Sequence, residues 1–352
     1  MSETGTDPRG LDLAAFARWY DAQRPGDVTG ELRARLIAGG KSNLTYEVTD
    51  GSSWWIVRRP PMGHVQATAH DMGREFTVMS GLADTDVPVP RTYAHCTDPD
   101  VIGAPFYVME RVLGTPYRTK AQLEELGPEL TAGIAHTMID VLARLHADDP
   151  DAVGLGGLGR PEGFLERQVR RWGRQLEGSR SRDLPDADEL LRRLSAQIAE
   201  PDFGQSGSGI VHGDYRLDNL LVDATRTGEE VRAVVDWEMA TLGDPLTDVA
   251  LLLVYDRLAA ISGGAAVADA SAAPGYPDAD TQLEQYAAAS GRDLSRMDFH
   301  LGLAHFKLAV ILEGIHFRHA QGHTVGEGFD TVGDAVQPLL AAGLTAIDRK
   351  AT

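Results

Sequence analysis

The sequence predicts an α+β fold with two lobes, a small one built on an antiparallel sheet and a larger, mainly helical one. As far as Met109, short runs rich in β-branched and aromatic residues alternate with glycine and proline, which is typical of strands and turns. Beyond that point, apolar residues recur at helical spacing. The chain has 352 residues, more than one domain usually contains, so two separate cores are expected. We place the first lobe at residues 1–109, a hinge at 110–114 and the second lobe at 115–352.

The first lobe is predicted to contain a leading helix, a short sheet and one further helix. The leading helix ends where Arg24, Pro25 and Gly26 interrupt the apolar periodicity. Two glycines, Gly39 and Gly40, mark a bend between the first two strands. The predicted helices are 11–23 and 70–82, and the predicted strands lie within 35–50, 53–61 and 86–112.

The second lobe is predicted to consist mostly of amphipathic helices. The Gly-rich stretch 154–164 contains G-x-G-G-x-G, but no strand precedes it, so we interpret it as a connection. Residues 262–280 are small and Pro-containing, which predicts a flexible surface excursion of the second lobe and a candidate lid. The predicted helices are 130–146, 165–182, 184–200, 294–319 and 330–348.

One stretch of the second lobe, VHGDYRLDNLLVD from residue 211, has the spacing of a phosphoryl-transfer catalytic loop. Asp214 follows His212 by two positions and Asn219 follows Asp214 by five, which matches H-x-D-x-x-x-x-N. Asp236 comes seventeen residues after Asn219. Two aliphatic runs flank a polar segment between them, which predicts a β-hairpin. Such a hairpin would bring Asn219 and Asp236 close together at its open end.

These residue types suit the transfer of a phosphoryl group from a nucleoside triphosphate, ATP or GTP, to a small hydroxylated acceptor. Such a transfer needs a carboxylate to orient and deprotonate the hydroxyl, and Asp214 is our candidate. Mg²⁺ prefers oxygen ligands, and Asn219 and Asp236 offer them. For His212 we favour a structural role, in which it supports the loop through hydrogen bonds.

The strings HGDYRLDN, VVDWE and GDPLTDVA together resemble the aminoglycoside phosphotransferase family, which has a protein-kinase-like fold. GGKSNLTY, RRPP and RQVRRW resemble the branch similar to the kinase-like domain attached to some acyl-CoA dehydrogenases. The resemblance extends over residues 32–320. In this family the acids of the last string, Asp244 and Asp248, brace the catalytic loop and cap the next helix.

The resemblance also implies a nucleotide site in the first lobe. Arg58 stands where protein kinases have a phosphate-binding lysine, and a register shift of one residue would give this role to Arg59. Glu75 would pair with that arginine. The glycine-containing turn departs from G-x-G-x-x-G and also fails as a Walker A motif. The complete set is the phosphate loop Gly39, Gly40, Lys41, Ser42 and Asn43, the adenine wall Ile56, the phosphate-binding pair Arg58 and Glu75, and the hinge residues Glu110 and Val112.

The acceptor is left open between an anion and a polycation. Four arginines crowd residues 167–174, and a solvated face paired with local acids is the favoured interpretation. The alternative assigns Arg167, Arg170 and Arg171 to an anionic acceptor such as a hydroxyacyl-CoA, whereas an aminoglycoside-like acceptor would need acidic contacts. A nucleotide-binding pseudokinase and a protein kinase are the competing functions. The arginine at position 58 motivates the former, and DWE in place of D-F-G weighs against the latter.

Composition limits the partners. A formal net charge of −19 argues against a nucleic-acid or anionic-membrane binder. No apolar run is long enough to span a bilayer, and residues 1–10 lack the pattern of a signal peptide. The single cysteine, Cys96, excludes an internal disulfide and is expected to be a small buried side chain. These features predict a cytoplasmic protein.

Overall fold

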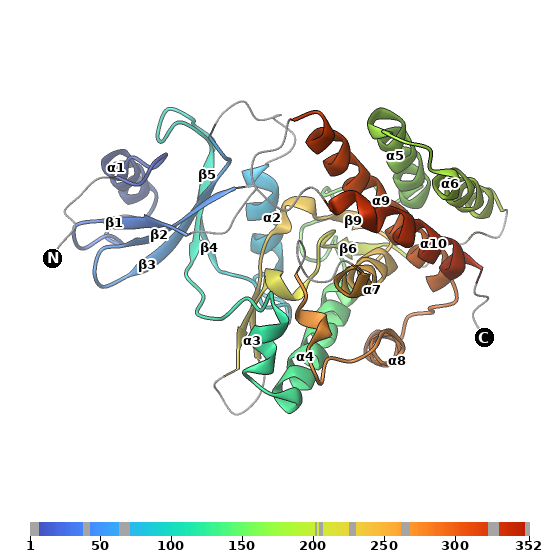
Figure 1. The fold of residues 1–352 in the computed structure, drawn as a ribbon. Helices are drawn as coiled ribbons and strands as arrows, with labels where there is room; N and C mark the ends of the chain where they lie inside the picture. Colours follow the sequence, from blue (N-terminus) through green and yellow to red (C-terminus); the bar gives the residue numbers. More distant parts are fainter. Residues whose placement is uncertain are drawn as a thin grey trace. The chain divides into compact units, whose positions relative to one another are not determined.

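The computed structural model divides the chain into two compact units (Figure 1). The first comprises Met1–Gly114 together with Arg232–Ala240, and the second comprises Thr115–Val231 and Thr241–Thr352. The structure describes residues 7–37, 43–62, 71–200, 203, 207–224, 230–261, 268–322 and 331–348.

The first unit is organised around an antiparallel sheet with the strand order β1-β2-β3-β5-β4. Each strand runs antiparallel to its neighbours. The helix α1, Leu13–Gln23, begins at Asp12, whose side chain accepts a hydrogen bond from the N–H of Ala15 and thereby caps the helix. The strands are β1 Arg33–Leu36, β2 Leu44–Thr49, β3 Trp54–Arg59, β4 Thr92–Cys96 and β5 Phe106–Glu110.

The alternation of side chains along β3 gives the sheet two different faces. Trp55 and Val57 are buried in the same core cluster as Tyr20 of α1, and the rings of Tyr20 and Trp55 lie 5.8 Å apart. Ile56 and Arg58 therefore point to the opposite face, as the pattern predicted. On that face Arg58 meets the helix α2, Met72–Leu82, which carries Glu75. Cys96 is buried in the core, as expected.

The second unit is mainly helical, and the long helix α9 lies at its centre. Along α9 the predicted apolar face is buried, including Phe299, Leu303, Phe306 and Val310. The helices α5, α6, α7 and α10 all contact α9. The helices are α3 Lys120–Glu124, α4 Pro128–Ala147, α5 Phe164–Ser179, α6 Pro185–Ile198, α7 Leu246–Ile261, α8 Ala279–Ser290, α9 Met297–Ala320 and α10 Val336–Ile347.

Two small sheets accompany these helices. The strand β6, Gly209–Val211, pairs with β9, Thr241–Gly243. The strands β7, Leu220–Asp223, and β8, Glu230–Val234, form the other sheet, which confirms the predicted strand pair around the polar segment. Short 3₁₀ helices are η1 Leu217–Asn219, η2 Trp237–Met239, η3 Ala270–Ala272 and η4 Val332–Ala335.

Two expectations about the second unit need correction. The predicted last helix is divided, because η4 precedes α10. The described part of the predicted surface excursion is exposed at residues 278–280 but packed near its start, where Ala270 and Ala273 are buried and the side chain of Asp269 accepts a hydrogen bond from the N–H of Lys120 at 2.9 Å. Small alanine side chains allow such a segment to lie close to its neighbours. Among the described helices, none combines the length and apolar character needed to cross a membrane.

Candidate active site

The predicted catalytic loop follows β6, and a buried aspartate stabilises it through hydrogen bonds. Asp248, in the first turn of α7, accepts hydrogen bonds from the N–H groups of His212 at 2.6 Å and Gly213 at 2.8 Å. Its carboxylate is also 3.3 Å from Nε2 of the buried His146. Burial alone would raise the pKa of Asp248, but the hydrogen bonds from His146 and Gly213 lower it. The predicted bracing role of Asp248 is confirmed.

Two further structural predictions for this loop hold. The ring of His212 is fully buried, and its Nδ1 accepts a hydrogen bond from the N–H of Asp214 at 3.3 Å. Asp244 caps the start of α7, because its Oδ1 accepts from the N–H of Leu246 at 3.1 Å. His300 of α9 lies 3.4 Å from the other carboxylate oxygen of Asp244.

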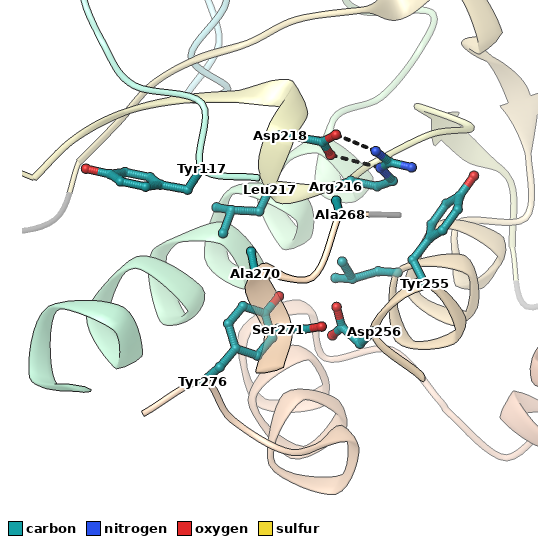
Figure 2. Close-up of a pocket in the computed structure, with 11 residues that line it drawn as sticks. Tyr117, Arg216, Leu217, Asp218, Tyr255, Asp256, Ala268, Ala270, Ser271 and Tyr276 are labelled. Atoms are coloured by element: carbon teal, nitrogen blue, oxygen red, sulfur yellow. Dashed lines mark hydrogen bonds and ion pairs between the residues drawn. The ribbon is translucent and has the colours of Figure 1, made fainter. Parts of the chain in front are cut away.

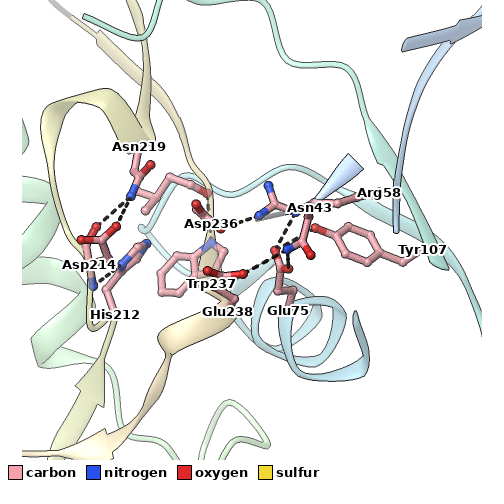
Figure 3. Close-up of polar contacts among 11 residues, drawn as sticks. Asn43, Arg58, Glu75, Tyr107, His212, Asp214, Asn219, Asp236, Trp237 and Glu238 are labelled. Carbon is pink, nitrogen blue, oxygen red and sulfur yellow. Dashed lines mark hydrogen bonds and ion pairs between the residues drawn. The ribbon is translucent and has the colours of Figure 1, made fainter. Parts of the chain in front are cut away.

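Asp214 and Asn219 lie side by side, as Figure 3 shows. The carboxamide nitrogen of Asn219 donates to the main-chain oxygen of Asp214 at 2.8 Å and to its carboxylate at 3.2 Å. The five-residue spacing produces this contact because the chain turns through η1 between the two residues. Asn219 thus fixes the orientation of the candidate base.

Basic and aromatic side chains surround this loop, and the sequence pattern did not identify them. The guanidinium of Arg216 forms an ion pair with Asp218 and lies 4.6 Å from the ring centroid of Tyr255 on α7. Lys307 of α9 approaches the main-chain oxygen of Gly213, with its Nζ at 3.4 Å. Lys307 is 93 positions from Asp214, so no local motif could have linked them.

A pocket adjoins the same loop (Figure 2). Arg216 and Asp218 border it on the loop side, and Tyr255 and Asp256 reach it from α7. Burial raises the pKa of Asp256 to about 7, and hydrogen bonds from Gln282 and Ser271 oppose that rise.

In the first unit, Arg58 lies between two carboxylates (Figure 3). Its Nε is 3.3 Å from the fully buried Glu75, which confirms the predicted ion pair, and its Nη2 forms an ion pair with Asp236. The hydroxyl of Tyr107 donates to Glu75 at 3.0 Å. Burial raises the pKa of Glu75 to about 7, although Arg58 opposes that rise. Arg58 rather than Arg59 meets the acids, because Arg59 donates to the carbonyls of Gly10 and Ile102 on the other face.

The segment around Asp236 is attached to the same unit by several contacts. The N–H of Val234 donates to the oxygen of Pro88, and Nη1 of Arg74 donates to the oxygen of Ala240 at 2.7 Å. Asn43 donates through its carboxamide to Glu238 at 3.1 Å and to Glu75 at 3.3 Å. Carboxylate oxygens of Glu75, Asp236 and Glu238 lie within 4.8 Å of one another, so this group could hold a metal ion.

Some of the remaining residues predicted to bind the nucleotide are described by the structure, and others are not. Ile56 is buried on the face that carries Arg58, and it pairs with Met109 of β5. The N–H of Glu110 donates a hydrogen bond to the main-chain oxygen of Arg91, the residue before β4. Val112 lies just beyond β5. Four members of the proposed phosphate loop lie outside the described residues: Gly39, Gly40, Lys41 and Ser42.

The arginines of α5 have different surroundings. Arg167 donates to the main-chain oxygens of Glu162 and Arg160, so it stabilises the turn that precedes the helix. Arg170 is exposed and lies 3.6 Å from Glu166. Arg171 places its guanidinium carbon 5.4 Å from the ring centroid of Trp172.

The α+β fold, the braced H-x-D-x-x-x-x-N loop and the acids around Arg58 define a phosphotransferase of the kinase-like type. The chain belongs to the phosphotransferase enzyme family, whose model matches residues 33–300.

Several relatives are similar to this chain over most of its length. Acyl-CoA dehydrogenase family member 11 of Gallus gallus is 31% identical over 325 residues, covering 91% of this chain and 41% of that protein. The Homo sapiens protein of the same name is 31% identical over 331 residues, covering 92% and 41%. This chain therefore spans about two fifths of the length of these relatives.

Solved structures confirm the fold. A crystal structure from Ralstonia eutropha, whose name places it among the aminoglycoside phosphotransferases, is 32% identical with a TM-score of 0.83, covering 97% of this chain and 99% of that one. An aminoglycoside phosphotransferase in ternary complex with ADP and hygromycin B has a TM-score of 0.59 at 15% identity, covering 90% and 95%. The predicted kinase-like fold is therefore confirmed.

Proposed function

We propose that this protein transfers the γ-phosphoryl group of ATP or GTP to a hydroxyl group of a small molecule. The observation that carries the proposal is the geometry of Asp214, whose carboxylate is oriented by Asn219 and whose loop is braced by Asp248. A carboxylate held in this way can orient an alcohol and accept its proton. The acceptor oxygen then forms a bond to the γ-phosphorus while the bond to the β,γ-bridging oxygen breaks and the nucleoside diphosphate leaves.

The nucleotide is assigned to the first unit. Arg58 supplies a fixed positive charge for the phosphates, and Glu75 and Tyr107 hold its position from the buried side. We assign Ile56 to the adenine, with Glu110 and Val112 at its edge. The phosphate loop would consist of Gly39, Gly40, Lys41, Ser42 and Asn43.

Magnesium would be held by Asp236 and Asn219. The donor types fit a hard cation, because a carboxylate and a carboxamide both offer oxygen ligands and the side chain of Asp236 is 29% exposed. When bound, the ion neutralises charge on the triphosphate.

For the acceptor we favour an anionic molecule such as a hydroxyacyl-CoA over a polycationic aminoglycoside. The relatives bear the name acyl-CoA dehydrogenase family member, and the loop that carries Asp214 has Arg216 and Lys307 beside it. Cations at this position would repel an ammonium-rich acceptor and attract an anion.

The test is a screen for ADP release with hydroxyacyl-CoA thioesters, hydroxylated metabolites and aminoglycosides as acceptors. We expect one class to be turned over, and Asp214→Asn to lower kcat by at least about a hundredfold, because it removes the base but keeps the shape of the side chain. Unchanged turnover in Asp214→Asn would remove Asp214 as the base. Nucleotide binding without turnover of any acceptor would favour a pseudokinase.

A further inference from the structure

Lys307 on α9 lies beside the loop that carries Asp214, and the proposed function uses only its positive charge. Its Nζ lies 3.4 Å from the main-chain oxygen of Gly213, the residue directly before Asp214. The chain has only four lysines, at positions 41, 120, 307 and 350, and relies on arginine for most of its positive charge. The side chain of Lys307 is half-buried, so its charge is partly withdrawn from water, and this position calls for an explanation.

The protein satisfies the ammonium group of Lys307 only in part. An ammonium group has three N–H donors. Within the described part of the chain, Lys307 makes one long hydrogen bond, to the main-chain oxygen of Gly213. Burial lowers the pKa of Lys307, and the carboxylates of Asp214 and Asp248 oppose this shift from a distance. Two donors thus remain available next to the candidate base.

A second cation lies against the same aromatic ring. The indole of Trp172 has Nζ of Lys307 at 5.7 Å from its centroid and the guanidinium carbon of Arg171 at 5.4 Å. Arg171 contributes to the lowered pKa of Lys307, so the two charges repel each other. An electron-rich oxygen bound by the ammonium would relieve this repulsion and satisfy a free donor.

We propose that Lys307 is a specificity-determining residue that binds an oxygen of the acceptor, carbonyl or carboxylate, close to the hydroxyl that is phosphorylated. This inference rests on the proposed function and adds a selection rule to it. The same ammonium group contacts Gly213, which precedes Asp214. The position of Lys307 therefore sets the distance between the acceptor oxygen that it binds and the hydroxyl group that is phosphorylated. An acceptor with an ammonium group at this position would be rejected by charge.

The experiment compares two acceptors that differ only at this oxygen: a hydroxyacyl-CoA thioester and the matching thioether, in which a methylene group replaces the carbonyl. We expect the wild-type protein to favour the thioester in kcat/KM by about tenfold to a hundredfold, the effect of one charge-assisted hydrogen bond. Lys307→Met should bring the ratio of the two kcat/KM values close to one. Lys307→Arg should restore part of the preference for the thioester. Lys120→Met, at a half-exposed lysine on α3, is the matched control and should keep the wild-type ratio.

Calorimetric binding of the same thioester separates this inference from the proposed function. We expect Lys307→Met to bind it about tenfold more weakly than the wild-type protein. Equal affinities, a wild-type ratio in Lys307→Met, or no binding to the wild-type chain would each overturn the assignment of Lys307. A thioester that binds through Lys307 but is never phosphorylated would support the assignment and contradict the proposed reaction.

Discussion

At the scale of single residues, Asp236 has the most unusual backbone. Its φ of 69° and ψ of 56° lie in the left-handed region, and it is the one non-glycine residue with positive φ in the described ranges. That conformation costs an L-residue about 1–2 kcal/mol, and Asp and Asn tolerate it best. The strain is maintained by the ion pair with Arg58 and by the buried Trp237, whose indole donates to the oxygen of Val234. Strain held in place in this way is typical of functional positions.

This backbone leads to a prediction that compares two variants of Asp236. Both Asp236→Asn and Asp236→Ala remove the charge and the ion pair with Arg58, but alanine has no side-chain oxygen to favour the left-handed conformation locally. We expect Asp236→Ala to be less stable than Asp236→Asn by about 1 kcal/mol. Thermal unfolding midpoints of the two variants at the same pH measure the difference. Equal midpoints would show that the left-handed backbone imposes no cost at this position.

Spacing predicted the contacts within the loop 212–219 because its residues are neighbours in the chain. His212, Asp214 and Asn219 lie within eight positions, so one turn of backbone decides their contacts. Lys307 and Tyr255 could not be predicted, since they reach the loop from distant helices through packing. No pattern along the chain records such contacts.

At the scale of elements, α7 carries two acids whose pKa values are shifted in opposite directions, the buried Asp248 and the half-buried Asp256. Asp248, in the first turn, is compensated by hydrogen bonds that keep its pKa low. Asp256, two turns further on, faces Gln282 of α8, Ser271 of η3 and Tyr276, and burial raises its pKa to about 7. The charged form of Asp248 is therefore compensated by its hydrogen bonds, whereas the charged form of Asp256 lowers the stability of the fold to an extent that depends on pH.

The raised pKa of Asp256 predicts how stability changes with pH. Its folded pKa of about 7 exceeds the ordinary value of 3.8, so the folded state binds more protons between these values. Its contribution to stability is therefore present below about pH 4 and is lost as pH rises through about 7. We expect Asp256→Asn, which keeps the shape and removes the titration, to gain stability relative to wild type as pH increases from 5 to 8.

The measurement is the difference in thermal midpoint between Asp256→Asn and wild type at each pH. Taking the difference removes the contributions of other titrating groups, including Glu75. A difference that stays constant from pH 5 to pH 8 would mean that the carboxyl group of Asp256 titrates normally.

The helix α5 shows where a sequence pattern is insufficient. Its arginines form one cluster in the sequence, but their partners differ: Arg167 binds carbonyls, Arg170 faces Glu166 and Arg171 lies over Trp172. Helical periodicity correctly predicted the helix and its basic face. It could not separate a residue that stabilises a turn from one that faces an aromatic ring, because that distinction depends on neighbours outside the helix.

At the scale of the whole molecule, the first compact unit is discontinuous in sequence. Arg232–Ala240 joins residues that precede it by more than a hundred positions, through Val234, Asp236 and Glu238. Strand and helix patterns are local, so they predicted the sheet of this unit but carried no signal for the distant segment. The role of Asp236 as a metal ligand came from its spacing and the family resemblance, and it stays a prediction.

Because Asp236 belongs to the unit that contains Arg58, nucleotide binding should be testable separately from catalysis. A ligand that binds only the native state stabilises it by about 2.7 kcal/mol at a concentration of a hundred times Kd. For a chain of this size, that corresponds to a rise of a few degrees in the thermal midpoint. We expect ATP with Mg²⁺ to raise the midpoint of the wild-type protein and of Asp214→Asn alike. Asp236→Asn should lose the part of the rise that requires Mg²⁺, since it lacks the anionic ligand; an undiminished rise would place the ion elsewhere.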